Sequence, residues 1–387
     1  MTVLNKLILV FLLTTYIQST LCDLSSKTSN KPSNESSEDD ELVFAQIIYR
    51  HGNRSILYTY PNDPYKNESF WPGGYGIITN AGKRRQFELG KYLRRRYERL
   101  IGTEYTPKNV YIRSSDVDRT LISALSNAAG MFPPSGEQIW RTNFLWQPVP
   151  IHTIPLKDDY LVYQAIPCPK FDELRDQYIT ESPEVKGLMR KHRSLLAELE
   201  KHSGMKIRTI LDAAIFNDPF EVELNRELTL PDWANKILNT SKETLEYFAA
   251  VYFQSATRTT DAKKAIAGFL IREIFDRFKN KTLALLNPDS KIHIYSAHDN
   301  TITNTLNALD LYDMRIPPLA ASVHFEMYRR GTEYYIQIFY RKFEFEDVAP
   351  INIPNCGTKC PLEDLYRLYA DILPTDSESY ESLCNIP

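Results

Sequence analysis

Three short apolar runs along the chain are each followed by polar residues and then by a stretch with helical periodicity. The runs at 42–49, 110–112 and 291–296 are rich in β-branched and aromatic residues, which predicts buried strands. Because strands and helices alternate, we expect an α/β sandwich of three layers with a mainly parallel central sheet.

Apolar positions at helical spacing follow each of these runs and predict helices at 79–100, 118–131 and 300–311. Thr79 is a residue type that caps helix N-termini, and it stands at the start of the first helix. The apolar sides of these helices would cover the sheet.

Between 167 and 284 the pattern becomes almost entirely helical. Helices inserted between the strands of one sheet commonly form a wall over a site at the strand ends, so we expect a helical cap here. The α/β core then comprises 42–166 and 285–350, and it closes with a hairpin around Arg330. Residues 351–387 form a tail that we expect disulfides to hold.

The N-terminus has the composition of a secretory signal peptide. Lys6 precedes an apolar run at 7–13, and small residues follow before position 22. A membrane anchor is the alternative, but the run is shorter than the roughly 20 apolar residues that a spanning helix needs. We therefore expect 1–22 to be removed and 23–41 to be a disordered polar leader. The expected destination is the extracellular space, with the lysosomal lumen as the alternative.

The 387 residues carry 46 lysines and arginines against 49 aspartates and glutamates, a net charge of −3. This balance provides no bulk field for nucleic acid or an acidic membrane surface, so neither is expected as a partner. No later run is long enough for a membrane anchor. Any preference for an anion must therefore come from a local group of side chains.

Four of the five cysteines remain once Cys22 is assigned to the edge of the signal peptide, and an even set in an oxidising compartment predicts two disulfides. Cys356 and Cys360 could close on each other and leave Cys168 for Cys384, although spacing alone leaves the other two pairings open. A metal site is the competing interpretation, but no histidine lies within ligand spacing of the Cys-x3-Cys pair.

Asn-x-Ser/Thr sequons at Asn34, Asn67, Asn239 and Asn280 agree with a secretory route and predict glycosylation. Asn53 also heads a sequon. We expect no glycan there, because its place in the motif described next predicts burial.

The first predicted strand runs directly into Arg50-His51-Gly52-Asn53-Arg54. Two guanidinium groups beside an imidazole at the end of a buried strand are costly unless an anion binds there. A guanidinium group can donate two parallel hydrogen bonds to two oxygens of one phosphate. Gly52 allows a close approach of the backbone. A neutral imidazole is a competent nucleophile towards phosphorus, and the neighbouring positive charges favour its neutral form.

Two further strand ends bring candidates to the same edge of the sheet. Arg113 follows the run at 110–112, and His298 and Asp299 follow the third run at the start of a helix. Helix N-termini attract anions, and the carboxyl ends of adjacent strands form the usual binding crevice. Asp299 could instead be only a helix cap, but His298 beside it favours a role in catalysis.

These motifs make the chain recognisable. Arg50-His51-Gly52-x-Arg54 together with the distant pair His298-Asp299 resembles the histidine acid phosphatases, the second branch of the histidine phosphatase superfamily. The segments 111–120, 145–148, 152–153 and 356–361 are also similar, so the likeness spans nearly the whole folded chain. It is strongest to prostatic and lysosomal acid phosphatases and includes acid phosphatase-like proteins of insect venom and saliva.

The resemblance implies a phosphoglycerate mutase-like fold and a secreted acid phosphatase that cleaves phosphate monoesters or phosphopeptides in two steps. It also implies a possible homodimer and neither a cofactor nor a metal. A protonated carboxyl is the useful form for the leaving group, so an acidic optimum follows, and burial would have to raise its pKa from about 4. The implied roles are His51 as nucleophile, Asp299 as proton donor, and Arg50, Arg54, Arg113 and His298 as phosphate ligands.

One position departs from the family pattern, because Ile56 stands where the motif usually has proline. The missing rigid turn would give Arg54 freedom to move, and a misplacement of about 1 Å costs considerable rate. The alternative function is therefore a weak or inactive secreted relative that binds a small ligand. A mutase-like transferase shares the Arg-His-Gly start but lacks the secretion signal and the His-Asp partner.

Overall fold

The computed structural model describes residues 40–344 and 348–386, and the residues from Glu41 onward form one compact unit. The predicted signal peptide and the sequon at Asn34 lie outside the described residues, as does nearly all of the predicted leader. The first strand, β1, begins at Glu41 and extends to Arg50.

The sheet has six strands in the order β2-β3-β1-β4-β5-β6. β2, β3 and β1 run parallel, whereas β4, β5 and β6 are added antiparallel. The predicted α/β class is confirmed, with a mixed sheet in which the parallel half consists of the three strands expected from the apolar runs. The remaining strands are β2 (Val110–Ser114), β3 (Ile292–Ala297), β4 (Ser322–Arg330), β5 (Glu333–Arg341) and β6 (Cys360–Pro361).

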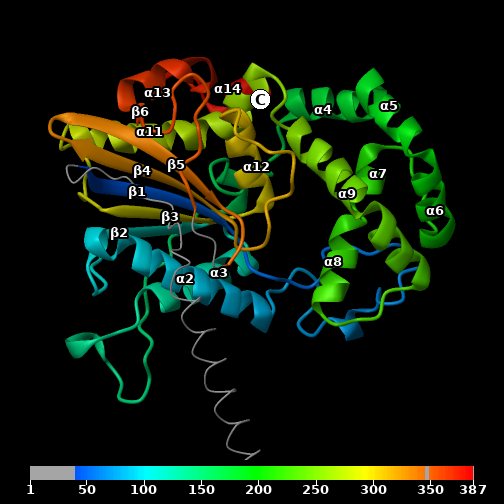
Figure 1. The fold of residues 1–387 in the computed structure, drawn as a ribbon, viewed down its shortest axis with the longest axis horizontal. Helices are drawn as coiled ribbons and strands as arrows, with labels where there is room; N and C mark the ends of the chain where they lie inside the picture. Colours follow the sequence, from blue (N-terminus) through cyan, green and yellow to red (C-terminus); the bar gives the residue numbers. More distant parts are fainter. Residues whose placement is uncertain (1–39, 345–347, 387) are drawn as a thin grey trace, which may run out of the picture. The chain divides into compact units, whose positions relative to one another are not determined.

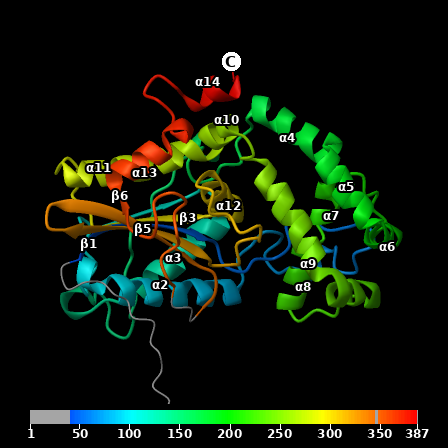
Figure 2. The ribbon, with the colours of Figure 1, turned by 45° about the horizontal axis from the view of Figure 1, so that its top comes forward.

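Helices cover both faces of the sheet, α2 and α3 on one and α11 and α13 on the other (Figures 1 and 2). Side chains alternate along β1, so Ile47 packs with α2 and α3 whereas Ile48 packs with α11. Thr79 caps α2 as predicted, because its hydroxyl accepts a hydrogen bond from the Gly82 backbone N–H. The bounds are α2 (Asn80–Ile101), α3 (Asp118–Met131), α11 (Phe269–Thr282), α12 (Asp299–Ala308) and α13 (Leu362–Leu368).

The segment predicted as a cap divides into two parts. Helices α5 to α9 pack around an apolar core of their own that contains Phe216 and Phe248, and they lie beside the sheet in Figure 1. Helix α11 instead contributes Ile274 and Phe278 to the core of the sheet. The helices of this region are α4 (Pro169–Glu181), α5 (Pro183–Lys191), α6 (Arg193–Ser203), α7 (Ile210–Ala214), α8 (Asn217–Asn225), α9 (Asp232–Ser255) and α10 (Thr260–Lys263).

Two disulfides fix the end of the chain. Cys168 pairs with Cys384 and Cys356 with Cys360, which is the pairing that closes the Cys-x3-Cys loop on itself. The predicted hairpin around Arg330 is present as β4 and β5. Short helical segments complete the chain, namely η1 (Glu68–Phe70), η2 (Gly136–Gln138), η3 (Leu156–Asp158), η4 (Lys264–Gly268), η5 (Ala370–Ile372) and α14 (Tyr380–Cys384).

None of the helices in the described part of the chain combines the length and the apolar composition needed to cross a bilayer.

Candidate active site

The candidate site lies where β1 and β3 end side by side. The parallel register places Arg50 opposite Ala297, and the His51 backbone N–H donates to the Ala297 carbonyl over 3.0 Å. His51 and His298 therefore follow adjacent strand ends, and their ring centroids are 5.7 Å apart. Both imidazoles are buried. Two residues far apart in the sequence thus lie side by side in one site.

The protonation of His51 follows from its surroundings. Its Nδ1 is 2.8 Å from the Gly52 carbonyl oxygen, which can only accept, so Nδ1 carries the proton and Nε2 keeps a lone pair. Burial lowers the pKa of His51 well below its usual value, and the charges of Arg50, Arg54 and Arg119 lower it further. The imidazole is therefore neutral in acid, where an exposed histidine would be protonated.

Helix α2 passes so close to the Arg-His-Gly motif that position 52 has room only for glycine. A Cβ on Gly52 would lie 2.4 Å from the carbonyl oxygen of Gly82, in the first turn of α2. The Gln86 side chain on α2 donates to the Arg50 carbonyl over 2.8 Å, and Ser123 on α3 accepts from the Gly52 N–H. The motif is thus held from behind by both helices.

Arg50 and Arg54 are buried, and each is held by a carboxylate. The Nη2 of Arg50 lies 2.8 Å from the Oδ2 of Asp299 and its Nη1 donates to the Pro317 carbonyl. Arg54 forms a bidentate pair with Asp218 on α8, at 3.1 and 2.7 Å. The Nε–H groups of both arginines find no hydrogen-bond partner in the described part of the chain. Buried donors without a partner suit a pocket that binds an anion.

The structure pairs Arg113, predicted as a phosphate ligand, with a buried carboxylate. Alternation along β2 places Ile112 in the core beneath α2 and α3, so Arg113 points to the other face of the sheet, the face that Ile48 and Arg50 share on β1. There its Nη2 pairs with the buried Asp159 at 2.7 Å. Arg113 is not among the charges that act on His51.

Arg119, in the first turn of α3, takes the place expected for Arg113. Its Nη2 lies 3.3 Å from Nδ1 of His298, and its Nε is also buried without a partner among the described residues. Burial and the neighbouring Arg54 lower the pKa of Arg119 to about 10. The sequence held one signal for this residue: Arg119, like Asp299, lies in the first turn of a helix that follows a parallel strand.

His298 is held on both ring nitrogens. Arg119 donates to Nδ1, so Nε2 carries the proton and donates to the Ser115 hydroxyl over 2.8 Å. Burial, with the charge of Arg119, lowers the pKa of His298 to about 3. The ring of Tyr163 meets that of His298 edge to face. In this arrangement the His298 imidazole is neutral and accepts a hydrogen bond from Arg119, which fixes the guanidinium group.

Asp299 is the first residue of α12, and its Oδ1 accepts from the Asn300 N–H over 2.9 Å. Burial would raise the pKa of Asp299, but the charges of Arg50 and Arg54 outweigh it and the pKa is lowered. This direction is opposite to the raised pKa expected from the sequence, because the two guanidinium charges favour the carboxylate more than burial disfavours it.

Arg54 is not loosened by Ile56. Its backbone forms a bridge with Ile78, and the Ser55 N–H donates to the Ile77 carbonyl over 2.8 Å. The Ile56 side chain is fully buried against Trp71 and Val222. The freedom expected from the missing proline is therefore removed by packing.

The other residues suggested by the sequence differ in their exposure. His152 is exposed and stacks on Tyr111 with centroids 4.7 Å apart. Asn53 is buried, which leaves no room for a glycan, whereas Asn67 and Asn239 are exposed. Asn280 is partly buried.

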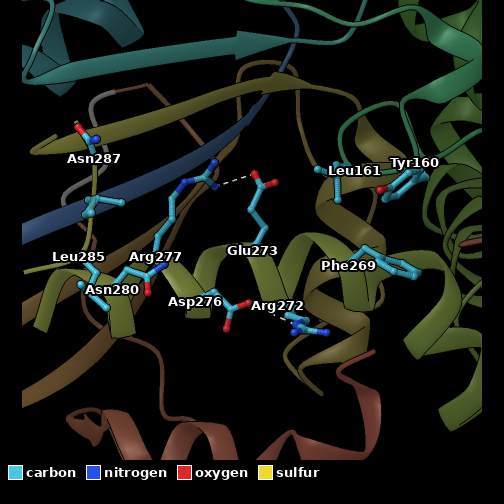
Figure 3. Close-up of a pocket in the computed structure, with 11 residues that line it drawn as sticks. Tyr160, Leu161, Phe269, Arg272, Glu273, Asp276, Arg277, Asn280, Leu285 and Asn287 are labelled. Atoms are coloured by element: carbon cyan, nitrogen blue, oxygen red, sulfur yellow. Dashed lines mark hydrogen bonds and ion pairs between the residues drawn. The ribbon is translucent and has the colours of Figure 1, made fainter. Parts of the chain in front are cut away.

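A separate cavity of about 550 Å³ lies over α11 (Figure 3). Its charged side chains are paired, Arg277 with Glu273 at 2.6 Å and Arg272 with Asp276 at 3.3 Å. None of the arginines or histidines of the candidate site lines it. The charged groups of this cavity thus already have partners, unlike the Nε–H groups of Arg50 and Arg54.

Two buried carboxyl groups join α8 to the loop that follows Arg54. Glu223 on α8 and Asp63 in the loop are both almost completely buried and lie close to each other. Burial and the neighbouring Asp63 raise the pKa of Glu223 to about 8. Burial also raises the pKa of Asp63. At least one of the two carboxyl groups therefore holds a proton below that pH.

Replacing Glu223 by glutamine raises the Tm at pH 8 by about 4 °C or more but leaves the Tm near pH 4.5 almost unchanged. The folded pKa of about 8 lies above the ordinary 4.5, so the free energy of unfolding falls as pH rises between these values. The amide removes this loss. Thermal unfolding at both pH values measures it, with the exposed Glu221→Gln on the same helix as control. An equal shift at both pH values would contradict a proton held between Asp63 and Glu223.

Comparison with known proteins agrees with this geometry. Residues 41–341 match the profile of the histidine phosphatase superfamily (branch 2). Prostatic acid phosphatase of Homo sapiens is 36% identical over 338 residues, 87% of this chain and 86% of that protein. Lysosomal acid phosphatase of Homo sapiens is 33% identical over 349 residues, 89% of this chain and 81% of that protein.

Solved structures show the same fold. The apo form of Hafnia alvei phytase superposes with a TM-score of 0.69 at 17% identity, and the match covers 91% of this chain and 100% of that one. The sequence matches confirm the resemblance that the Arg-His-Gly and His-Asp motifs predicted. The chain belongs to branch 2 of the histidine phosphatase superfamily.

Proposed function

We propose that this protein is a secreted acid phosphatase that hydrolyses phosphate monoesters through a phosphohistidine intermediate on His51. The observation that carries the proposal is a neutral His51 beside three arginines, Arg50, Arg54 and Arg119, whose buried Nε–H groups lack partners within the described residues. A phosphate group supplies the missing acceptors and charge.

In the first step the Nε2 lone pair of His51 attacks phosphorus and the bond from phosphorus to the ester oxygen breaks. Asp299 gives its proton to the departing alkoxide. The carboxyl has a lowered pKa beside Arg50, but a bound phosphate anion counters the arginine charges and raises that pKa. Binding of the substrate therefore favours the protonated form of Asp299, which is the form that donates a proton.

In the second step water attacks the phosphorus of phosphohistidine while the Asp299 carboxylate accepts a proton from it. The N–P bond breaks, inorganic phosphate leaves and His51 returns to its neutral form. The guanidinium groups stabilise the equatorial oxygens in both steps, which is the main task in phosphoryl transfer.

The names of the relatives support the substrate class, since both are acid phosphatases. Within that class, small phosphate monoesters and phosphopeptides are the expected substrates. Two disulfides and the exposed sequons at Asn67 and Asn239 support a secretory route. A homodimer stays a prediction of the resemblance. The alternative of an inactive binding protein rested on Ile56, whose burial removes that argument.

Hydrolysis of an aryl phosphate between roughly pH 4 and 8, with a metal chelator present, tests the proposed activity. Quenching the reaction of a radiolabelled substrate without acid tests for phosphate bound covalently to the protein. We expect turnover that is fastest in acid and label bound covalently to the protein. A folded protein without turnover would overturn the proposal, and turnover without covalent label would overturn the phosphohistidine step.

A further inference from the structure

The guanidinium group of Arg54 presents two edges, and each can bind a pair of oxygens. One edge joins Nη1 and Nη2, and the other joins Nε and Nη2. Asp218 on α8 occupies the first edge, at 3.1 Å from Nη1 and 2.7 Å from Nη2. The second edge contains the Nε–H that has no partner in the described part of the chain. The carboxylate thus determines which edge of Arg54 stays open.

Helix α8 is fixed where it meets the loop after Arg54. Val222 packs against Ile56 and Trp71, two positions beyond the arginine and further along the same loop. Glu223 lies against Asp63. The contacts of Val222 and Glu223 therefore hold α8, and with it Asp218 in the first turn of the same helix, beside the loop that carries Arg54.

The charge of Asp218 also favours this geometry. Burial would lower the pKa of Arg54, but the charge and hydrogen bonds of Asp218 outweigh it and raise the pKa. A paired guanidinium can remain charged close to Arg50 and Arg119, which repel it. Removing the carboxylate would leave three like charges with one fewer counter-charge, and Arg54 would turn away from the other two.

We propose that Asp218 is a positioning residue for phosphoryl transfer: it holds one edge of Arg54 so that the Nε/Nη2 edge faces the phosphate. The inference rests on the proposed function. It assigns to the helical segment a role in the chemistry, because the residue that orients a phosphate ligand of the sheet comes from the cap helix α8.

The test compares Asp218→Ala, Asp218→Asn and Asp218→Glu with the unchanged protein in aryl phosphate hydrolysis. A misplacement of about 1 Å costs about 10²-fold, so we expect kcat/KM to fall about 10²-fold in the alanine variant and less in the glutamate variant. The inhibition constant of inorganic phosphate rises in parallel. Glu198→Gln, which breaks the exposed pair with Lys236 on the cap, is the matched control and keeps full activity.

A double-mutant cycle separates positioning from a general loss of stability. In the Arg54→Ala background, Asp218→Ala has no further effect on kcat/KM if the carboxylate acts through Arg54. Additive losses, or losses that follow a lower Tm alone, would overturn the proposal. If the unchanged protein hydrolyses nothing, the proposed function fails. If it is active and Asp218→Ala is equally active, only the positioning role fails.

Discussion

Replacing His51 by alanine lowers kcat/KM for an aryl phosphate by about 10⁴-fold or more, because no other group can accept the phosphoryl group. Nε2 of His51 has the lone pair that attacks phosphorus, since Nδ1–H donates to the Gly52 carbonyl. His298 cannot replace it, because both of its ring nitrogens are already held by Arg119 and Ser115. Steady-state kinetics with the purified variant measures the loss.

The loss should lie in the chemistry and not in the capture of phosphate. The arginines keep their partners without His51, since Arg50 is held by Asp299 and Arg54 by Asp218. We therefore expect calorimetry to give phosphate binding within a few-fold of the unchanged protein. A variant that loses binding but keeps residual turnover in proportion would argue against a nucleophilic His51.

Replacing Asp299 by asparagine has an effect that depends on the leaving group. General acid catalysis contributes about 10²- to 10⁴-fold, and an alkyl phosphate, whose alkoxide needs a proton, loses the most. An aryl phosphate with an acidic phenol loses less in the first step. The same carboxylate activates water, so labelled phosphohistidine accumulates in the variant during turnover of the aryl substrate.

Asp310→Asn is the control for this variant, because Asp310 follows α12 closely and its exposed carboxylate pairs with Lys263. It should leave both substrates unaffected. Equal losses of Asp299→Asn on alkyl and aryl substrates would contradict proton donation by Asp299 and would point instead to its bond with Arg50.

The sequence predicted the parallel half of the sheet and the residues at two strand ends, because apolar runs that stop at charged residues are a local signal. It did not distinguish Arg113 from Arg119. Which arginine approaches His298 depends on tertiary contacts, since Arg113 pairs with Asp159, 46 positions away, whereas Arg119 on α3 reaches His298.

The division of the helical segment was also beyond the sequence. Periodicity predicts that one side of α11 is buried but does not identify the surface that buries it, and here that surface is the sheet. Asp218 gave no local signal, since it reads as an ordinary acidic residue in the first turn of a helix. Its partner Arg54 lies 164 positions away, so the pair arises only from the tertiary fold.

The bond between Cys168 and Cys384 closes a covalent ring around 216 positions of sequence. The ring contains α8 and Asp299, whereas His51 lies on the chain outside it. A protease that cuts once in a loop between the cap helices would therefore release no fragment. Nicked molecules would migrate as a single species in electrophoresis without reductant, and two pieces would separate only after the disulfide is reduced.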